Sequence, residues 1–300
     1  MRKVVLLVAI LALSVLLIAG CSPDEGNGAE KPKIIVGSKN FTEQLVVGHM
    51  VGLLMEDAGY PVEYQLRLGG SGLVHEALVE GEVNVYVEYT GTGLTVMLEE
   101  DPMSDPDETY ARVKEAYKEK WNLVWLEPWG FNNTYTIAMR QDVAADLGIE
   151  KISDLKDKAG DLLIGATHEF IPRQDGLAGL QETYGFEFKE AKGMDEGLMY
   201  QAVRDGQVDA ISAFATDGRI PAFELITLID DLSYFPPYYA APVVRGDLLE
   251  EDPEVATILN KLARKIDDAA MAQLNYQVDE DKEDPSAVAK KFLQDNGLIE

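Results

Sequence analysis

Apolar and polar positions follow one another along the chain in blocks that predict strands and helices in turn. Residues 33–37 form a short apolar strand, and after a turn a helix is predicted from Thr42, with its apolar positions on one face: Val46, Val47, Met50, Val51 and Leu54. A second helix is predicted over 73–80, and 83–87 is typical of a buried strand. Because strand and helix alternate from there on, the pattern predicts an α/β fold with largely parallel sheets.

An internal repeat predicts that the chain has two similar halves. Residues 72–89 align without gaps on 197–214, with Gly, Leu, Ala, Gly and Val at the same offsets. Two helix-glycine-strand units can also look alike by chance. Ligand-facing groups in open α/β sheets gather at the carboxyl ends of strands, so two such lobes predict a cleft between them. Each half contributes one cation and one aromatic ring to this cleft. The first half contributes Lys39 and Tyr89, and the second contributes Arg173 and Phe214.

Two aromatic, proline-bearing segments are predicted to connect the lobes. They cover 126–139 and 234–244, and each leads into an apolar strand. Two crossings make a hinge, and closure of a hinge around a ligand is a known mode of binding. The predicted division is therefore a first lobe of 33–132 plus 239–300 and a second lobe of 133–238.

The amino end has the pattern of a secretory signal over residues 1–20. Two cations precede the apolar run 4–18, which is short for a membrane-spanning helix, and small residues follow it. Ile18-Ala19-Gly20-Cys21 resembles the bacterial lipobox, which implies that Cys21 becomes the lipidated first residue of the mature protein. An ordinary cleaved signal with a chance cysteine is the alternative. Polar residues 21–32 are predicted to be a flexible tether, which places the protein outside the cytoplasm with a lipid anchor in the cell membrane.

Composition excludes several classes of site and partner. The formal net charge of −27 argues against nucleic acid and anionic lipid as partners. A single cysteine excludes a disulfide framework and a cysteine-ligated metal site. The acidic residues are spread along the chain, which favours a solvated surface and is compatible with a salty habitat. We expect a monomer that needs no cofactor.

The aromatic residues at the predicted strand ends and crossovers suit a quaternary ammonium ion. Such a cation has no N–H to donate, and pairing it with a buried carboxylate would desolvate the acid at high cost. Aromatic faces attract a desolvated cation by about 2 kcal/mol per good contact. A carboxylate at the other end of a ligand would require cations and N–H or O–H donors. The chain offers Tyr89, Tyr135, Phe214 and Tyr238 for the first task, and Lys39, Arg173 and residues 90–93 for the second.

Four segments resemble the glycine betaine/choline/carnitine-binding proteins of osmoprotectant ABC importers. They are 37–44, 76–78, 86–92 and 215–218, and the likeness runs from about Lys33 to the C-terminus. The resemblance implies a type II periplasmic-binding-protein fold, no catalysis, and delivery of the solute to separate permease and ATPase subunits. It places an aromatic box on Tyr89, Tyr135, Phe214 and Tyr238, a carboxylate clamp on Lys39, Thr92 and Arg173, and a backbone carbonyl facing the ammonium at Asn133.

Phe214 departs from the family, which more often has tyrosine at this position. Phenylalanine keeps the π face and loses the hydroxyl, so the cage is expected to survive. A hydrogen bond that locks the closed lobes would be lost. Lower affinity or a preference for a bulkier head group would follow.

Several residues also have plain structural explanations. Tyr89 and Phe214 end apolar strands and would also fit a core, while Lys39 and Arg173 would also fit surface turns. Tyr234 and Tyr239 compete with Tyr238 for its place in the box. Trp125 and Trp129 precede the first crossover and are expected to pack in the interior.

Other functions remain open. The three histidines, His49, His75 and His168, lie too far apart in the sequence for a zinc pair, and no nucleophile elbow is present, which argues against a secreted enzyme. The same fold could bind an amino acid, ectoine or an oxyanion, or serve as a sensory receptor domain. An N–H-bearing ammonium would require a buried acid in the cleft, and strand alternation points Glu88 away from the face of Tyr89. Choline has no carboxylate and would be repelled by two cations, so glycine betaine, proline betaine or carnitine are expected to fit better.

Overall fold

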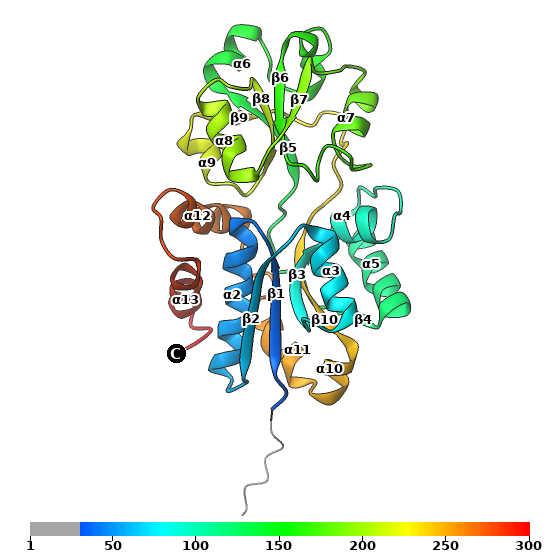
Figure 1. The fold of residues 1–300 in the computed structure, drawn as a ribbon, viewed down its shortest axis with the longest axis vertical. Coiled ribbons are helices and arrows are strands. Elements are labelled where there is room, and N and C mark those ends of the chain that lie inside the picture. The colour runs from blue at the N-terminus through cyan, green and yellow to red at the C-terminus, as the bar shows by residue number, and fades with distance from the viewer. Residues whose placement is uncertain (1–30) are drawn as a thin grey trace, which may run out of the picture. The chain divides into compact units, whose positions relative to one another are not determined.

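Two five-stranded sheets, each with helices packed on it, organise the computed structural model, which describes residues 31–300 (Figure 1). The predicted signal over 1–20, Cys21 and the tether as far as residue 30 lie outside the described residues. Residues 32–300 form one compact unit. Within the described part of the chain, no helix has the length and apolar character that crossing a membrane requires.

The two sheets have the same topology. The first follows the order β2-β1-β3-β10-β4 and the second the order β7-β6-β8-β5-β9. The strands of the first lobe are β1 (Ile34–Lys39), β2 (Val62–Gly69), β3 (Val85–Tyr89), β4 (Leu123–Trp125) and β10 (Ala240–Arg245). Those of the second lobe are β5 (Tyr135–Arg140), β6 (Leu163–Ala166), β7 (Glu190–Gly193), β8 (Ala210–Phe214) and β9 (Leu225–Thr227).

Each sheet is mixed, because one of its strands runs opposite to the others. β1 runs parallel to β2 and β3, but β10 runs antiparallel to β3 and β4. The second lobe repeats this, because β5 is antiparallel to both β8 and β9. The physical reason lies in the crossovers. β3 and β8 end at the cleft, whereas β10 and β5 begin there, so that Ala240 pairs with Tyr89 and Tyr135 with Phe214.

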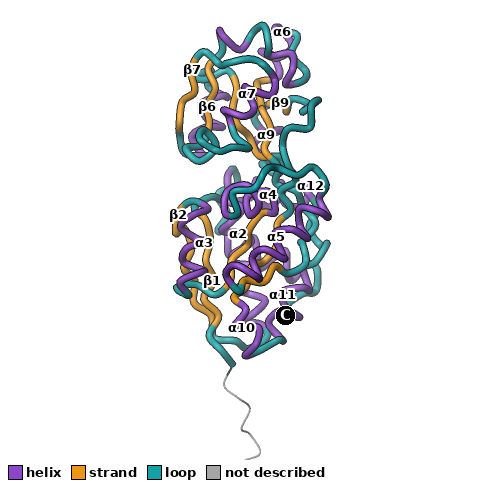
Figure 2. Tube along the Cα trace, turned by 90° about the vertical axis from the view of Figure 1, so that its right-hand side faces the viewer, coloured by secondary structure: helices purple, strands orange, loops and turns teal. Residues whose placement is uncertain are grey.

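Helices flank the first sheet (Figure 2). They are α2 (Thr42–Asp57), α3 (Ser71–Glu80), α4 (Thr90–Thr92) continued by the π-helical turn η1 (Gly93–Met97), α5 (Pro106–Trp121), α10 (Gly246–Glu251), α11 (Glu254–Leu259), η4 (Asn260–Leu262), α12 (Asp268–Asp279) and α13 (Pro285–Asp295). Asp105 caps α5 and Asp284 caps α13, each accepting from two backbone N–H groups and each followed by proline.

α2 is buried on more than the one face that its sequence predicts. Its apolar side chains pack between the sheet and the C-terminal helices α12 and α13, which lie beside it in Figure 1. Glu43 and Gln44, in its first turn, are buried as well. The reason is that this helix is covered from two sides, so its polar residues have roles inside the protein.

The second lobe has shorter helical elements. They are α6 (Gln141–Leu147), η2 (Ile152–Leu155), η3 (Ala159–Asp161), α7 (Leu177–Tyr184), α8 (Glu196–Arg204) and α9 (Arg219–Ala222). Its core includes a cluster around Tyr200, Val203 and Ile211, where α8 covers β8. α3 and α8 occupy the equivalent positions that the internal repeat predicts.

The two crossovers run side by side at the hinge. Asn132 and Tyr239 form an isolated antiparallel bridge, and the backbone N–H of Asn133 donates to the carbonyl of Tyr238 over 3.1 Å. α12 adds a third connection, because Asn275 Nδ2 donates to the carbonyl of Thr216 in the second lobe over 2.9 Å. The strands of each sheet lie within the predicted lobe segments, and the exact boundaries at 132/133 and 238/239 stay a prediction.

Candidate functional site

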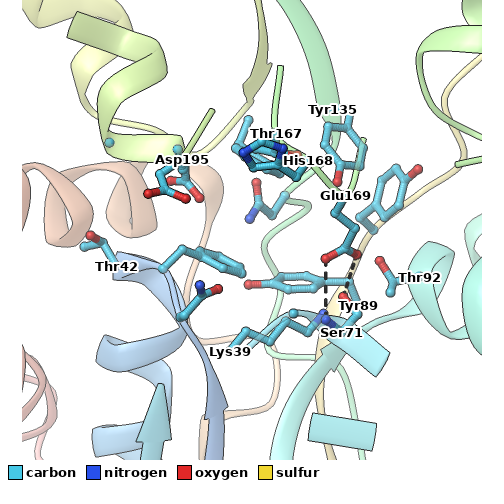
Figure 3. A pocket seen from close by; sticks show the side chains of 18 of the residues that line it. Lys39, Thr42, Ser71, Tyr89, Thr92, Tyr135, Thr167, His168, Glu169 and Asp195 are labelled. Atoms are coloured by element: carbon cyan, nitrogen blue, oxygen red, sulfur yellow. Dashed lines mark hydrogen bonds between the residues drawn. The ribbon is translucent and has the colours of Figure 1, made fainter. Parts of the chain in front are cut away.

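A cavity of about 490 Å³ lies where the ends of the strands of both sheets meet (Figure 3). The structure brings all the residues predicted for the box and the clamp into its lining: Lys39, Tyr89, Thr92, Asn133, Tyr135, Arg173, Phe214 and Tyr238. Tyr234 and Tyr239 do not line this cavity, so Tyr238 is the ring that the second crossover contributes. We call this cavity the pocket.

The aromatic rings come from the cleft ends of four segments. Tyr89 ends β3, Phe214 ends β8, Tyr135 begins β5 and Tyr238 precedes β10. The Tyr135 ring lies 4.9 Å from the Phe214 ring and 5.4 Å from that of Tyr238, measured between centroids, and is perpendicular to the latter. The Tyr135 hydroxyl has no hydrogen-bond partner in the described part of the chain. The guanidinium of Arg173 lies 5.3 Å from the centroid of the Tyr135 ring.

Phe41 is an aromatic wall that the sequence pattern did not reveal. Its ring is nearly parallel to that of Phe214, with centroids 6.1 Å apart, and lies 6.3 Å from the Tyr89 ring. Phe41 comes from the first lobe and Phe214 from the second, so this stack joins the two lobes. A missing hydroxyl at 214 suits this contact, because the ring meets another apolar ring. The sequence signal that could have revealed Phe41 is its position in segment 37–44, one of the four segments that resemble the family.

Lys39 is paired with a buried acid. Its ammonium lies 2.5 Å from Oε1 of Glu88 and 5.0 Å from the centroid of the Tyr89 ring. The side chain of Glu88 is fully buried and does not line the pocket, as strand alternation predicts, but its carboxylate still reaches Lys39. Two hydrogens of the ammonium remain for a ligand.

Arg173 is buried and is not part of an exposed turn. Its Nε and Nη2 each donate to the carboxylate of Asp175 over 2.7 Å, and its Nη1 donates to Glu169 over 3.0 Å. Nη2 also lies 3.5 Å from the hydroxyl of Thr92. Burial raises the pKa of the Asp175 carboxyl, but the hydrogen bond and charge of Arg173 outweigh burial and hold this pKa below its usual value.

Polar contacts join the lobes on one side of the pocket. Ser71, at the start of α3, donates to Glu169 of the second lobe through its hydroxyl (2.8 Å) and its backbone N–H (3.4 Å), as Figure 3 shows. Asp175 of the second lobe accepts from Thr95 over 2.8 Å and from the hydroxyl of Tyr238 over 2.5 Å. In this arrangement Glu169 and Asp175 connect the clamp residue Arg173 to the first lobe.

Glu43 is the other residue that the sequence analysis missed. Its Oε1 accepts from the hydroxyl of Tyr89 (2.7 Å) and from Asn133 Nδ2 (2.8 Å). Its Oε2 accepts from the hydroxyl of Thr216 (2.6 Å) and from Asn275 Nδ2 (3.0 Å). Burial raises the pKa of Glu43, against the lowering effect of these bonds. One carboxylate thus ties α2 to a ring of the box, the first crossover, the second lobe and α12.

Of the other residues considered from the sequence, His168 lines the pocket, whereas His49 and His75 do not. Trp125 and Trp129 are fully buried and do not line the pocket, so the packing role predicted for them is confirmed. Residues 31–300 contain no group of three or more His, Cys, Asp or Glu side chains arranged to hold a metal ion. Burial lowers the pKa of His75 to about 4, so this histidine is neutral at physiological pH.

Comparison with known proteins gives consistent matches. Residues 32–295 match the family described as the substrate binding domain of the ABC-type glycine betaine transport system. The chain is 35% identical to the carnitine transport binding protein OpuCC of Listeria monocytogenes, over 100% of this chain and 98% of that protein. It is 38% identical to a glycine-betaine-binding protein of Pseudomonas aeruginosa, over 91% of this chain and 90% of that protein.

A solved structure confirms the fold. The crystal structure of a glycine betaine/carnitine/choline ABC transporter protein matches with a TM-score of 0.75 and 33% identity, covering 89% of this chain and 100% of that chain. The predicted two-lobe periplasmic-binding-protein fold is therefore confirmed.

Proposed function

Because the chain belongs to the family of substrate-binding domains of ABC-type glycine betaine transport systems, we propose that it captures a quaternary-ammonium zwitterion, glycine betaine or proline betaine, in the pocket between its lobes. At the level of the family, it is an extracytoplasmic substrate-binding protein that delivers a glycine betaine/carnitine-type solute to an ABC permease. It is not an enzyme. The identity of the solute and the roles of the residues are the proposal.

The observation that carries the proposal is the set of rings around Tyr135. Tyr89, Phe214 and Tyr238 line the same pocket as Tyr135, and the faces of aromatic rings suit a trimethylammonium group, which has no N–H to donate. The rings attract the cation through their quadrupole, by about 2 kcal/mol per desolvated contact. Arg173 already lies 5.3 Å from the Tyr135 centroid and 5.9 Å from that of Tyr238, as expected for rings that attract cations.

Lys39, Thr92 and Arg173 are proposed to hold the ligand carboxylate. The ammonium of Lys39 keeps two hydrogens, and the guanidinium of Arg173 keeps one on Nη1, beyond those donated to Glu88, Asp175 and Glu169. Charge-assisted bonds of this kind are the strong ones in a partly desolvated site. The backbone carbonyl of Asn133 is proposed to face the ammonium, as the resemblance to the family implies.

Choline is the second candidate, and the ion pairs favour it more than the sequence did. Each clamp cation is already paired with a buried carboxylate, Lys39 with Glu88 and Arg173 with Asp175. The repulsion that two unpaired cations would exert on choline is therefore largely cancelled. The remaining preference for a zwitterion rests on the unused N–H donors alone.

A lipid on Cys21 is proposed as the membrane anchor. The support is the sequence Ile18-Ala19-Gly20-Cys21, which precedes the described residues. Cells that express the protein with Cys21→Ser are expected to release it from the membrane fraction. Retention of that variant in the membrane fraction would contradict a lipid on this cysteine.

Isothermal titration with glycine betaine, proline betaine and choline tests the proposed solute. The Tyr135→Ala variant is the cleanest probe of the cage, because the hydroxyl of Tyr135 makes no bond with the described residues. We expect it to weaken glycine betaine binding by about 2 kcal/mol, or roughly thirtyfold. The matched control is Tyr239→Ala, a tyrosine of the other crossover whose ring does not line the pocket. Equal affinity of the two variants would refute the cage, and tighter binding of choline than of both betaines would refute the zwitterion.

A further inference from the structure

Three carboxylates lie against the two cations of the proposed clamp. Glu88 lies 2.5 Å from the ammonium of Lys39. Asp175 and Glu169 lie 2.7 Å and 3.0 Å from guanidinium nitrogens of Arg173. We call Glu88, Glu169 and Asp175 the clamp acids. They outnumber the two cations, although the ligand group that the clamp is proposed to hold is itself a carboxylate. A clamp that only attracted an anion would gain nothing from these acids, so they call for an explanation.

Two of the clamp acids are buried behind the cations. The side chains of Glu88 and Asp175 are 0% exposed, and neither residue lines the pocket. Glu169 does line the pocket, and its side chain is 36% exposed. Water and salt screen buried charges far less than exposed ones. The charges of Glu88 and Asp175 therefore act on a ligand in the pocket although neither residue touches it.

Further hydrogen bonds hold these two buried acids in place. Glu88 also accepts from the hydroxyl of Tyr86 over 3.1 Å. Asp175 also accepts from the hydroxyls of Thr95 and Tyr238, over 2.8 Å and 2.5 Å. Displacement of either acid by a ligand carboxylate would leave these hydroxyls without their acceptor. We therefore expect a ligand to use the free hydrogens of the cations while both acids stay beside them.

The two acids that contact Arg173 are ionised at neutral pH. Burial raises the pKa of the Asp175 carboxyl, but the hydrogen bond and charge of Arg173 outweigh burial. Burial also raises the pKa of Glu169, and here the charges of Lys39 and Arg173 outweigh it. Both pKa values therefore lie below the usual range, and each acid brings a full negative charge to the clamp.

The net charge at the clamp matters because the candidate ligands differ in charge. Choline has the trimethylammonium group of glycine betaine but a neutral hydroxyl in place of the carboxylate, so it is a cation and not a zwitterion. An uncompensated guanidinium would repel choline and attract the carboxylate of glycine betaine, since both charges lie in a partly buried site of low dielectric. A guanidinium paired with acids does both less strongly.

We propose that the clamp acids are positioning residues that determine specificity: by compensating Lys39 and Arg173, they set how strongly the pocket discriminates between zwitterionic and cationic quaternary ammonium compounds. They act through the cations that they pair with. This inference rests on the proposed function for the roles of the box and the clamp. It assigns the choice of ligand charge largely to Glu88 and Asp175, which do not line the pocket.

Asp175→Asn tests the inference, because asparagine keeps the shape of the side chain and removes its charge. Arginine does not lose its proton in proteins, so Arg173 keeps its charge with one acid fewer beside it. Isothermal titration should show that the affinity ratio of glycine betaine to choline rises by about fivefold or more relative to the wild type. Both ligands carry the same trimethylammonium group, so the ratio cancels any change in the box. An unchanged ratio would overturn the inference. So would a lower ratio, which would mean that Asp175 only holds Arg173 in place for the ligand carboxylate.

Glu169→Gln keeps the test decisive if the buried Asp175 variant does not fold. Because water partly screens Glu169, its loss should raise the same ratio by about twofold or more, less than the loss of Asp175 does. A ratio that stays at its wild-type value would overturn the inference. The matched control Glu182→Gln removes the same charge at an exposed position of the same lobe and should leave the ratio unchanged. An equal rise in this control would make the total charge of the protein responsible and would overturn the inference as well.

The wild-type titrations separate this inference from the proposed function. If the wild type binds glycine betaine and the variants leave the ratio unchanged, the box and the clamp stand and the clamp acids have only a structural role. If neither glycine betaine nor choline binds the wild-type protein, the proposed function fails together with the inference.

Discussion

Replacement of Glu43 tests whether one buried carboxylate sets the geometry of the pocket. Glu43→Ala removes the acceptor of four donors: the hydroxyls of Tyr89 and Thr216 and the amides of Asn133 and Asn275. Asn275 retains a bond to the carbonyl of Thr216, so three donors lose their only acceptor here. Each stranded buried donor costs about 1–3 kcal/mol. The vacated space admits water, which favours the lower end, and the expected loss of unfolding free energy is about 3 kcal/mol.

Glu43→Gln is the matched control. An amide in this place keeps one acceptor oxygen, and its NH₂ group can donate to Oδ1 of Asn133, which is unpaired in the native protein, if that side chain turns over. Neutral hydrogen bonds replace charge-assisted ones, so the expected cost is smaller, about 1–2 kcal/mol.

Urea unfolding at neutral pH measures both variants, and titration with glycine betaine measures the effect on the pocket. The loss of affinity should follow the loss of stability, because Tyr89 belongs to the box and its hydroxyl is held by Glu43. A cost below about 1 kcal/mol for Glu43→Ala would refute the reasoning, since it lies below the cost of a single stranded donor. So would a larger cost for Gln than for Ala.

Three further changes have expected outcomes. Gly91→Ala places a Cβ atom 2.7 Å from the Tyr238 ring and should weaken glycine betaine binding at least tenfold, as measured by titration. The control Gly72→Ala adds a Cβ atom with no other atom within 4 Å and should leave the affinity unchanged. Equal effects of the two variants would contradict the placement of Tyr238. Phe214→Ala should cost about 1–2 kcal/mol of binding through loss of one wall of the cage, and unchanged affinity would place the cage elsewhere. The pKa of Asp175 is lower in the folded protein than its ordinary 3.8, so its pairing with Arg173 stabilises the fold above about pH 4 and is lost below that. Urea unfolding at pH 7 and at pH 3 should therefore show that the unfolding free energy falls more between these two pH values for the wild type than for Asp175→Asn. An equal fall in both proteins would contradict the pairing.

The parts of the site that the sequence predicted are those governed by local pattern. Tyr89 and Phe214 end corresponding strands of an internal repeat, and strand ends in α/β sheets face a cleft. Lys39 ends β1 and Arg173 follows β6, the equivalent strand of the second lobe, so the same rule places them. The antiparallel direction of β5 and β10 was missed because it depends on where the crossovers enter each sheet, which periodicity does not show.

Residues whose partners are distant in the sequence were not predictable in this way. Glu43 stands in the first turn of a largely apolar helix, and its partners Thr216 and Asn275 lie 173 and 232 positions away. Glu169 and Asp175 flank Arg173, but their bonds to Ser71 and Thr95 cross between the lobes. Only the folded chain shows that the predicted clamp cations are already paired, and this changes the expected balance between betaine and choline.

The position of the bound ammonium is the most direct test of the proposed cage. A crystal structure of the protein with glycine betaine should place the quaternary nitrogen within about 6 Å of the centroids of the Tyr89, Tyr135, Phe214 and Tyr238 rings. Its carboxylate should then contact Lys39, Thr92 or Arg173. A ligand whose nitrogen lies against Glu196 and Asp279, with none of the four rings within that distance, would contradict the account.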